Sequence, residues 1–335
     1  MTPKQIKGLF ILHKTAYDKI YGEKELSQIS RYVDIYAPVQ TPESIMKNPA
    51  LLNDAEVIFS GWGMPKMDGE FLDSAPNLRV VFYGSGTVKY FITDEVWDRN
   101  IKITSAFAAN AIPVAEFALG QIILSLKSVW HHSRDIRQQR TFERSRCLGP
   151  GMYGSTVGLI SLGMIAQHLC SLLKPFNVKV LAYDPYIDRQ TAGRLNVEMC
   201  SLDDVFRLSD VVSLHAPLSD QTIGMIQGRH LSMMKPYATF INTARGAIVR
   251  EDELTEVLAK RPDLTALLDV TDPEPPHETS ALYDLENVIL TPHIAGSMGN
   301  ECMRMGEYML QELMLYLSHK PLKWEIRKHE IGIMA

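Results

Sequence analysis

Cysteine is scarce in this sequence, and no segment is a long uninterrupted run of apolar residues. The four cysteines are Cys147, Cys170, Cys200 and Cys302, and no two of them are close enough for a CxxC metal or redox motif. This spacing predicts reduced thiols in a cytoplasmic protein and no metal site. The apolar run near the N-terminus is too short for a signal peptide. We also expect no stretch of about 18 apolar residues that would span a membrane.

An excess of positive charge is also missing. The formal net charge is −5, from 34 basic and 39 acidic residues, so nucleic acid or anionic lipid is not expected as the main partner. A local basic run from Arg134 to Arg146 is interpreted as one face of a helix. The length of 335 residues suits two globular domains of ordinary size.

Short apolar segments alternate with amphipathic ones along the whole chain. Two of the amphipathic segments, Asp203–Leu208 and Glu251–Lys260, are typical of helices. Strands separated by helices form parallel sheets that are covered on both faces, so the pattern predicts a doubly wound α/β fold. The expected strands are Gly8–Leu12, Val57–Ser60, Val80–Tyr83, Thr156–Ile160, Val178–Tyr183, Val211–His215, Ala238–Asn242, Thr265–Val270 and Val288–Thr291.

Two longer segments have helical spacing throughout. The first extends from Pro113 to about Gln139, with Pro113 expected in the first helical turn and Asn110 close to the capping position. The second extends from about Met298 to about His319. The part of the chain between them has the size of a dinucleotide-binding domain, which we expect to be inserted into another domain. The expected domains are residues 105–297 and, as the second, residues 1–104 with 298–335.

The segment from Thr156 to Ala166 predicts a strand, a tight turn and the start of a helix. The positions of a GxGxxG phosphate-binding loop fall on Ser161, Gly163 and Ala166, and the serine is a departure from that pattern. The free helix N-terminus after Gly163 would bind the pyrophosphate of a dinucleotide. From these residues alone, an ordinary packing turn is an equal alternative.

Asp184 favours the phosphate-binding interpretation. It follows the next expected strand and lies 21 residues after Gly163, where an acidic side chain accepts hydrogen bonds from the adenosine ribose. An aspartate there repels the 2′-phosphate of NADP, so NAD is the expected cofactor. The alternative is a turn residue before Pro185.

Three ionisable residues, Arg245, Glu274 and His293, follow the last three expected strands. The carboxyl ends of parallel strands line the ligand crevice of a sheet. A guanidinium binds a carboxylate through two parallel hydrogen bonds, a histidine exchanges a proton near neutral pH, and a carboxylate orients the imidazole. The set predicts hydride transfer at a carbon beside a carboxylate, although each residue alone is compatible with a structural role.

The segments that carry these residues, NTARGAIV, LDVTDPEPP and TPHIAG, resemble three signatures of the D-isomer-specific 2-hydroxyacid dehydrogenase family. SDVVSLHAPLSDQTIGMI and NAIPVAEFALG are similar to two further segments of that family, and the similarity covers about residues 78–300. The resemblance implies a Rossmann NAD-binding domain inserted into a flavodoxin-like substrate domain. It also implies an NAD-dependent oxidoreductase that interconverts a 2-oxo acid and a D-2-hydroxy acid, an active site between the domains, and a homodimer through the NAD-binding domain.

The resemblance further implies roles for the matching positions. Arg245 would bind the substrate carboxylate and carbonyl, and His293, paired with Glu274, would be the general acid and base. The backbone N–H groups of Ser85 and Gly86 would hold the substrate carboxylate. Asp269 would accept a hydrogen bond from the nicotinamide carboxamide of the cofactor. The expected cofactor contacts are Ser161, Gly163, Met164, Ile165, Asp184, Pro185, Ala216, Pro217, Thr222, Thr243, Ala244, Asp269 and Gly296.

The identity of the acid is left open by the sequence. Relatives that act on phosphoglycerate tend to carry an Arg-Ser pair near the position of Trp62, where this sequence has no arginine, so a phosphorylated acid is disfavoured. Glu274 stands where formate dehydrogenases have glutamine, which disfavours that reaction. An alternative function is NAD(H) sensing without turnover, as in a corepressor branch of the same family, and the departure at Ser161 motivates it.

Overall fold

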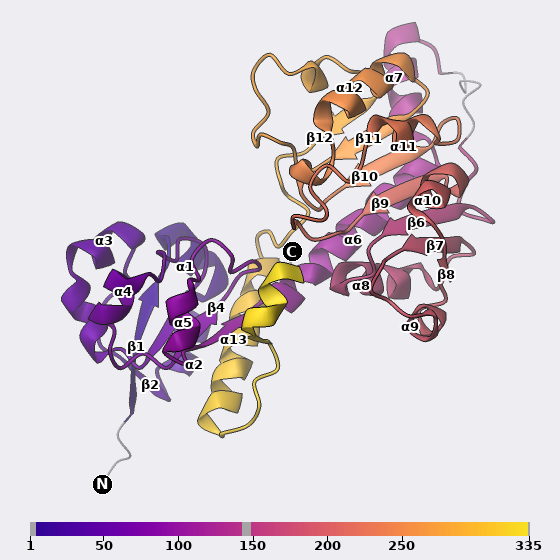
Figure 1. Cartoon of the computed structure of the whole chain (residues 1–335). Coiled ribbons are helices and arrows are strands. Elements are labelled where there is room, and N and C mark those ends of the chain that lie inside the picture. Colours follow the sequence, from indigo (N-terminus) through magenta and orange to yellow (C-terminus); the bar gives the residue numbers. More distant parts are fainter. Residues whose placement is uncertain (1–4, 143–148, 334–335) are drawn as a thin grey trace. The chain divides into compact units, whose positions relative to one another are not determined.

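The computed structural model of the chain describes residues 5–142 and 149–333. The chain divides into two compact units, each built around one β-sheet (Figure 1). Unit 1 consists of Met1–Asn110 with Ser297–Met334, and unit 2 of Ala111–Gly296. The inserted segment therefore begins after residue 110 and ends at residue 296, compared with the limits of 105 and 297 expected from the sequence.

Unit 1 contains a six-stranded sheet in the order β13-β5-β4-β3-β1-β2. Neighbouring strands are parallel, except that β13 pairs antiparallel with β5. The order β2-β1-β3-β4-β5 is that of flavodoxin-like folds. The strands are β1 (Ile6–Ile11), β2 (Val33–Ile35), β3 (Val57–Ser60), β4 (Val80–Tyr83), β5 (Lys102–Ser105) and β13 (Glu325–Ile326).

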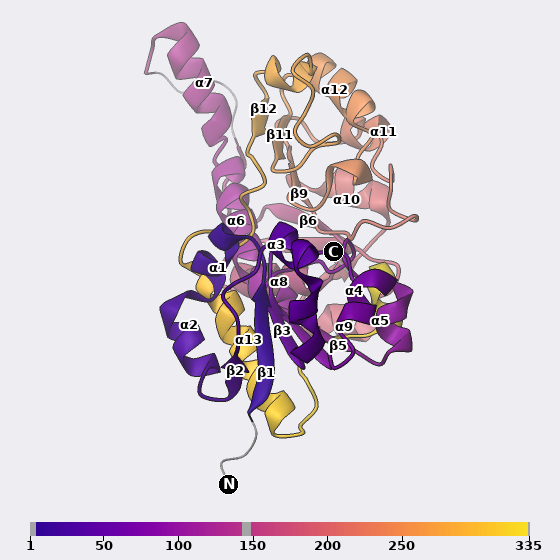
Figure 2. The ribbon, with the colours of Figure 1, turned by 90° about the vertical axis from the view of Figure 1, so that its left-hand side faces the viewer.

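Helices cover both faces of the unit 1 sheet (Figure 2). One face presents Phe10, Phe59 and Phe82 to three helices, of which the last comes from the C-terminal segment. Those helices are α1 (Lys14–Ile20), α2 (Gly22–Ile29) and α13 (Glu301–Leu317). The helices against the other face are α3 (Pro42–Lys47), α4 (Gly69–Ser74) and α5 (Asp94–Asp98).

Unit 2 contains a seven-stranded sheet in the order β12-β11-β10-β9-β6-β7-β8, and all its neighbouring strands are parallel. This is the Rossmann order extended by one strand, with the change of direction between β6 and β9. The strands are β6 (Thr156–Ile160), β7 (Lys179–Tyr183), β8 (Glu198–Met199), β9 (Val211–Leu214), β10 (Thr239–Asn242), β11 (Thr265–Leu268) and β12 (Val288–Leu290).

Two apolar clusters enclose this second sheet. One contains residues of α8 (Met164–Leu173) and of the later part of α6 (Phe107–Leu126). The other contains residues of α10 (Leu202–Leu208), α11 (Gly228–Ser232) and α12 (Glu251–Lys260). Two further helices of this unit are α7 (Val129–Gln139) and α9 (Arg189–Arg194). A parallel sheet buried on both faces confirms the doubly wound fold expected from the sequence.

Every expected strand is present, with ends that differ by up to two residues. The strands β2, β5, β8 and β13 were not expected. Three of them, β2, β8 and β13, are edge strands of two or three residues, too short for an apolar period to be recognised. The fourth, β5, has only four residues and begins with an exposed lysine.

The predicted start of the first long helix is wrong. Helix α6 begins at Phe107, so Pro113 lies inside the helix instead of in its first turn. Asn110 is likewise helical and does not cap; its side-chain oxygen accepts a hydrogen bond from the N–H of Ser297 at 2.8 Å. The proline removes one internal helical hydrogen bond, which the surrounding packing tolerates here.

The prediction of one continuous helix up to about Gln139 is also wrong. It ends at Leu126, Ser128 adopts a left-handed conformation with φ of 50°, and α7 follows as a separate helix. The basic run does not form one helix face, because α7 ends at Gln139 and Arg140 is again left-handed. Three further residues of that region, Arg144, Arg146 and Cys147, lie outside the described residues.

Helix α6 is long and apolar enough to cross a membrane by length and composition, contrary to the expectation that the chain has no such segment. Its residues Ala115, Ala118 and Ile122 are buried in the apolar cluster of unit 2. Core packing therefore accounts for its composition. Among the described cysteines, Cys170, Cys200 and Cys302 are free thiols.

Close packing of α1 against α13 predicts a large effect of one methyl group. A Cβ on Gly306 would lie 2.0 Å from the carbonyl oxygen of Ile20. We expect Gly306→Ala to lower the free energy of unfolding by about 1–3 kcal/mol, measured by urea unfolding. The control is Gly69→Ala in α4, where a Cβ meets nothing within 4 Å of the described residues and stability should hold or rise slightly. Equal stability of the wild type and Gly306→Ala would contradict this packing.

Candidate functional site

The loop between β6 and α8 leaves a helix N-terminus open. Gly163 is the N-cap residue of α8, and its lack of a side chain leaves the helix without a side-chain cap. A Cβ placed on Gly163 would meet none of the described residues within 4 Å, so there is space beside this loop. The N–H groups of Met164 and Ile165 begin the helix and have no helical acceptor, which suits an anionic ligand.

Ser161 stands at the point where the chain turns sharply out of β6. Its φ of 73° is left-handed, a conformation that is unfavourable by roughly 1–2 kcal/mol for a residue with a Cβ. Its hydroxyl donates to Asp184 Oδ2 at 3.3 Å, and the N–H of Leu162 donates to the same oxygen at 2.7 Å. The carboxylate of Asp184 thus supports the strained turn.

The other oxygen of Asp184 shapes the loop after β7. Oδ1 accepts hydrogen bonds from the N–H groups of Tyr186 at 2.8 Å and Ile187 at 3.2 Å, with Pro185 between the carboxylate and these donors in the chain. Asp184 therefore stabilises the turn before Pro185 and Tyr186, which was the structural alternative to a role in cofactor binding. It also joins the loops after β6 and β7. A ribose hydroxyl would have to replace one of these four bonds, of which that from Ser161 is the longest.

Arg245, Glu274 and His293 follow the adjacent strands β10, β11 and β12 at one edge of the sheet. His293 Nδ1 lies 2.7 Å from Glu274 Oε1, and the two side chains are 46% and 42% exposed. His293 has a left-handed φ of 54°. Such conformations are rare outside glycine and concentrate at functional sites. The structure therefore joins two of the three expected catalytic side chains directly.

Asp269 fixes the segment that carries His293. Its Oδ1 accepts hydrogen bonds from Thr291 Oγ1 at 2.6 Å and from the N–H of Ile294 at 2.9 Å, and its Oδ2 accepts from the N–H of Ala295 at 2.8 Å. Its backbone carbonyl accepts the N–H of His293 at 2.9 Å. This positioning of His293 was not recognised from the sequence, where Asp269 was assigned only to the cofactor.

The side chain of Arg245 folds back onto its own loop after β10. Its Nη1 donates to the carbonyl of Ala244 at 2.6 Å. Burial lowers the pKa of its guanidinium and Glu274 acts in the opposite direction, and the group stays positively charged. A Cβ on the next residue, Gly246, would lie 2.0 Å from the carbonyl carbon of Thr271. Glycine there lets the arginine loop lie directly against the segment that leads to Glu274.

The remaining residues expected to contact a cofactor also follow strands of unit 2. Thr222 lies in the loop after β9, and its Oγ1 donates to the carbonyl of Pro217 at 2.6 Å. The residues Ala216, Thr243, Ala244 and Gly296 follow the ends of β9, β10 and β12. All of them lie on the carboxyl side of the parallel sheet, where the loop between β6 and α8 also lies.

In unit 1, Ser85 and Gly86 follow β4. Ser105 Oγ is 2.7 Å from the carbonyl oxygen of Ser85 and 2.5 Å from that of Gly86, which fixes the loop from its carbonyl side. Among the described residues, no acceptor takes the N–H group of either residue. The loop therefore retains two backbone donors for an anionic group.

Sequence reasoning missed His215, which directly follows β9 and is buried. Its Nε2 is 2.9 Å from Ser213 Oγ, and burial lowers the pKa of the ring to about 4. The available signal was a serine and a histidine two residues apart at the end of an otherwise apolar strand, since strand residues two apart share a face.

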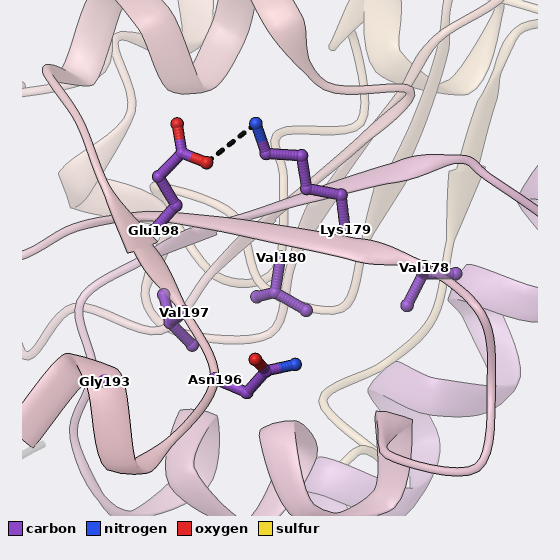
Figure 3. A pocket seen from close by; sticks show the side chains of 7 residues that line it. All are labelled: Val178, Lys179, Val180, Gly193, Asn196, Val197 and Glu198. Carbon is purple, nitrogen blue, oxygen red and sulfur yellow. Dashed lines mark ion pairs between the residues drawn. The ribbon is translucent and has the colours of Figure 1, made fainter.

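A shallow hollow of about 290 Å³ lies at the amino ends of β7 and β8, opposite the edge described above. Lys179 and Glu198 at its rim form an ion pair of 2.7 Å, as Figure 3 shows. Because these charges neutralise each other, the hollow offers no unpaired charge to a ligand.

In residues 5–142 and 149–333, no group of three or more His, Cys, Asp or Glu side chains is placed to hold a metal ion.

The neutral ring of His215 predicts sensitivity to acid. An unfolded histidine titrates near 6.5, whereas the pKa of His215 in the fold is about 4, so the unfolded state takes up the proton first. Stability is therefore lost as the pH falls from about 6.5 towards 4, by up to about 3 kcal/mol. Urea unfolding at about pH 7.5 and pH 5 measures this loss. His215→Leu should lose less stability than the wild type between those conditions, and an equal loss would contradict the assignment.

Residues 119–295 match the sequence model described as D-isomer specific 2-hydroxyacid dehydrogenase, NAD binding domain. The matched segment contains the loop between β6 and α8, Asp184, and the three residues Arg245, Glu274 and His293.

Curated relatives extend the similarity beyond this domain. The chain is 29% identical over 258 residues to a D-3-phosphoglycerate dehydrogenase of Archaeoglobus fulgidus, covering 77% of this chain and 49% of that protein. It is 33% identical over 258 residues to a glyoxylate reductase of Thermofilum pendens, covering 75% of this chain and 76% of that protein. The chain thus spans about half the length of the phosphoglycerate dehydrogenases that it matches.

Solved structures show the same fold. A phosphoglycerate oxidoreductase of Rhizobium etli has a TM-score of 0.82 at 20% identity, covering 98% of this chain and all (100%) of that one. A D-isomer specific 2-hydroxyacid dehydrogenase of Lactobacillus delbrueckii, in an NAD complexed form, has a TM-score of 0.80 at 20% identity and covers 96% of this chain.

Proposed function

Because this chain belongs to the D-isomer specific 2-hydroxyacid dehydrogenase family, we propose that it is an NAD(H)-dependent oxidoreductase that interconverts a 2-oxo acid and a D-2-hydroxy acid. The observation that carries this proposal is the 2.7 Å contact between His293 Nδ1 and Glu274 Oε1, beside the strand end that bears Arg245. An acid–base pair next to a guanidinium is the set that this chemistry needs.

In the proposed mechanism, His293 gives a proton to the substrate oxygen during reduction and takes it back during oxidation. Its Nδ1 is engaged by Glu274, so Nε2 is the nitrogen that faces the substrate. Glu274 keeps the ring in one orientation and offsets the positive charge of the protonated ring near Arg245. His293 has a left-handed backbone conformation, and Asp269 holds the segment around it. Together they fix the position from which the imidazole side chain extends.

Arg245 binds the substrate carboxylate through paired N–H groups and polarises the adjacent carbonyl. Bound NADH supplies the hydride for that carbonyl carbon. We infer that residues 1–104 and 298–335 form the substrate domain, because the backbone N–H groups of Ser85 and Gly86 suit an anionic group such as a carboxylate.

The residues of unit 2 fit this cofactor. The open N-terminus of α8 and the free space beside Gly163 suit a pyrophosphate. Asp184 suits the hydroxyls of the adenosine ribose and disfavours a 2′-phosphate. The proposed cofactor contacts also include Ala216, Pro217, Thr222, Thr243, Ala244, Asp269 and Gly296.

We infer a small, non-phosphorylated acid as the substrate, supported by Trp62 and the lack of an arginine in the segment from Ser60 to Pro65.

We also infer a homodimer formed through the NAD-binding domain in the cytoplasm. The free thiols are compatible with a reducing compartment, and partly exposed apolar side chains such as Leu124 and Tyr237 of unit 2 suit an interface.

The reaction is tested by following NADH oxidation with a panel of 2-oxo acids: glyoxylate, hydroxypyruvate, pyruvate, 2-oxobutyrate, 2-oxoglutarate and phenylpyruvate. We expect turnover of at least one acid by the wild type. Loss of acid–base catalysis in His293→Ala should reduce the rate by roughly 10²–10⁴-fold. Equal turnover in that variant would remove His293 from the mechanism. Tight NADH binding without turnover of any acid would favour the NAD(H)-sensing alternative.

Cofactor choice is tested at Asp184. In Asp184→Ser, the dissociation constants of NADH and NADPH should approach each other by roughly tenfold or more, because charge-assisted bonds to the ribose and repulsion of the 2′-phosphate are both lost. Fluorescence titration measures both constants. Asp188→Ser serves as the control, since that carboxylate caps α9 and should leave the ratio unchanged. An unaltered ratio in Asp184→Ser would contradict the ribose role.

A further inference from the structure

The segment that bears Glu274 has few backbone groups that could anchor it. Residues 272–276 read Asp-Pro-Glu-Pro-Pro, and the prolines have no N–H group. The N–H of Asp272 donates to Glu251 Oε2 at 3.0 Å, whereas that of Glu274 meets no acceptor among the described residues. Residues 272–275 are also exposed, so apolar packing does not hold them. The bond to Glu251 therefore ties this segment to a neighbouring helix.

Glu251 is a fixed acceptor for this bond. It is the first residue of α12, whose side chains Leu254 and Leu258 are buried in an apolar cluster of unit 2. Its carboxylate is half-buried: burial raises the pKa of the group, and the N–H of Asp272 acts in the opposite direction. The charged or titratable groups that face it are those of Asp272, Asp252 and His277. A partly buried carboxylate needs donors in place of water, so the bond stabilises both partners.

The residue before the segment is fixed as well. Thr271 is buried, and its Oγ1 donates to the carbonyl of Pro273 at 2.8 Å. The backbone of Gly246 lies directly against Thr271, where a Cβ would approach the carbonyl carbon to 2.0 Å. The chain is thus well placed up to Thr271, and the position of the exposed part that follows depends on its own bonds.

The position of the Glu274 carboxylate depends on the peptide group two residues earlier. Glu274 Oε1 lies 2.7 Å from His293 Nδ1, and a hydrogen bond weakens steeply when its length or angle changes. A rotation of the backbone at Asp272 would displace this carboxylate. The bond from Asp272 to Glu251 opposes that rotation.

Glu251 also has a purely structural use. It is one of the acidic residues in the first turn of α12, where negative charge favours the helix dipole. Asp252 in the same turn is exposed and makes no hydrogen bond or ion pair with the described residues. Loss of the Asp252 side chain removes the same charge from the same turn and leaves the bond to Asp272 in place. The two uses can therefore be separated.

We propose that Glu251 is a positioning residue of the active site: by holding the N–H of Asp272, it keeps the carboxylate of Glu274 against Nδ1 of His293. This role rests on the proposed function, because the contact matters for a rate only if His293 transfers a proton. An acid–base group needs a fixed orientation, and a residue that locks its partner contributes to that orientation without touching the substrate.

The first test measures single turnovers of NADH oxidation by stopped flow, with the 2-oxo acid that the wild type reduces fastest. Glu251→Ala should lower the rate constant roughly 3- to 10-fold, the effect of one hydrogen bond, and leave the KM of the acid and the Kd of NADH unchanged. Glu251→Gln should recover most of the rate, because its amide oxygen also accepts the N–H of Asp272. Asp252→Ala should match the wild type.

A double-mutant cycle separates positioning from a general structural effect. In the background of Glu274→Ala, the further change Glu251→Ala should leave the remaining rate unchanged, because no carboxylate is left to position. An equal loss of rate in both backgrounds would overturn the inference. If Glu251→Ala does not fold, Glu251→Asp takes its place, since it keeps the charge at the start of α12 and withdraws the carboxylate from Asp272.

A spectroscopic measurement on the free chain does not depend on turnover. Nitrogen-15 NMR of histidine-labelled chains reports which ring nitrogen of a neutral imidazole carries the proton, and His293→Ala identifies the signal among the 10 histidines. We expect the proton of His293 on Nδ1 in the wild type, where Glu274 accepts it. Glu251→Ala and Glu274→Ala should both shift the population towards Nε2. Glu251→Gln and Asp252→Ala should resemble the wild type.

These measurements distinguish a failure of the inference from a failure of the proposed function. A wild type that turns over none of the acids would contradict the proposed function, and the NMR signal would still decide whether Glu251 holds Glu274 against His293. A His293 signal that is altered in Glu274→Ala but unchanged in Glu251→Ala would overturn the inference. A wild type with the His293 proton on Nε2 would overturn it as well.

Discussion

A parallel sheet has only one carboxyl edge, and the candidate site of unit 2 depends on that constraint. All seven strands of this sheet point the same way, so each chain segment that leaves a strand does so at that edge. Residues as distant in sequence as Ser161 and His293 are thereby brought to one edge of the unit 2 sheet. The order of strands then separates the loops proposed to bind phosphate, after β6 and β7, from the residues proposed for acid–base catalysis, after β10, β11 and β12.

Carboxylates give the loops at this edge their geometry. Asp184 accepts four hydrogen bonds that join two loops, and Asp269 accepts three that hold the segment around His293. Glu251 accepts the N–H of Asp272 at 3.0 Å, at the start of the segment that bears Glu274, and burial raises the pKa of its carboxyl group. Such groups are stable when partly buried because backbone donors replace their water.

The same loops contain the less favourable features of the fold. Ser161 and His293 have left-handed backbones, and Gly246 lies against Thr271 where no side chain would fit. In each case a neighbouring group holds the conformation: Asp184 for the first, Asp269 for the second, and close backbone packing for the third. Preorganised loops lose less conformational entropy on binding, so this arrangement favours a ligand at the edge.

The sequence by itself determined the α/β class and all strands except β2, β5, β8 and β13. Strands that are buried on both faces leave continuous apolar runs such as Val211–Leu214, and these runs can be recognised. It also indicated that Arg245, Glu274 and His293 follow consecutive strands, since that depends only on order along the chain. Features that depend on a few residues were not predictable, such as the two-residue strand β8 and the break at Ser128 between α6 and α7. Local propensity there is weak, and packing decides.

The tertiary structure alone decided the hydrogen bonds of the site. The 2.7 Å contact of His293 with Glu274 joins residues that follow different strands, and no periodicity encodes a distance between loops. The bonds that Asp269 makes to the His293 segment have the same origin, as does the 2.9 Å contact of His215 Nε2 with Ser213 Oγ. Side-chain partners are fixed only when the register of neighbouring strands brings their ends together, and that register is a property of the folded sheet.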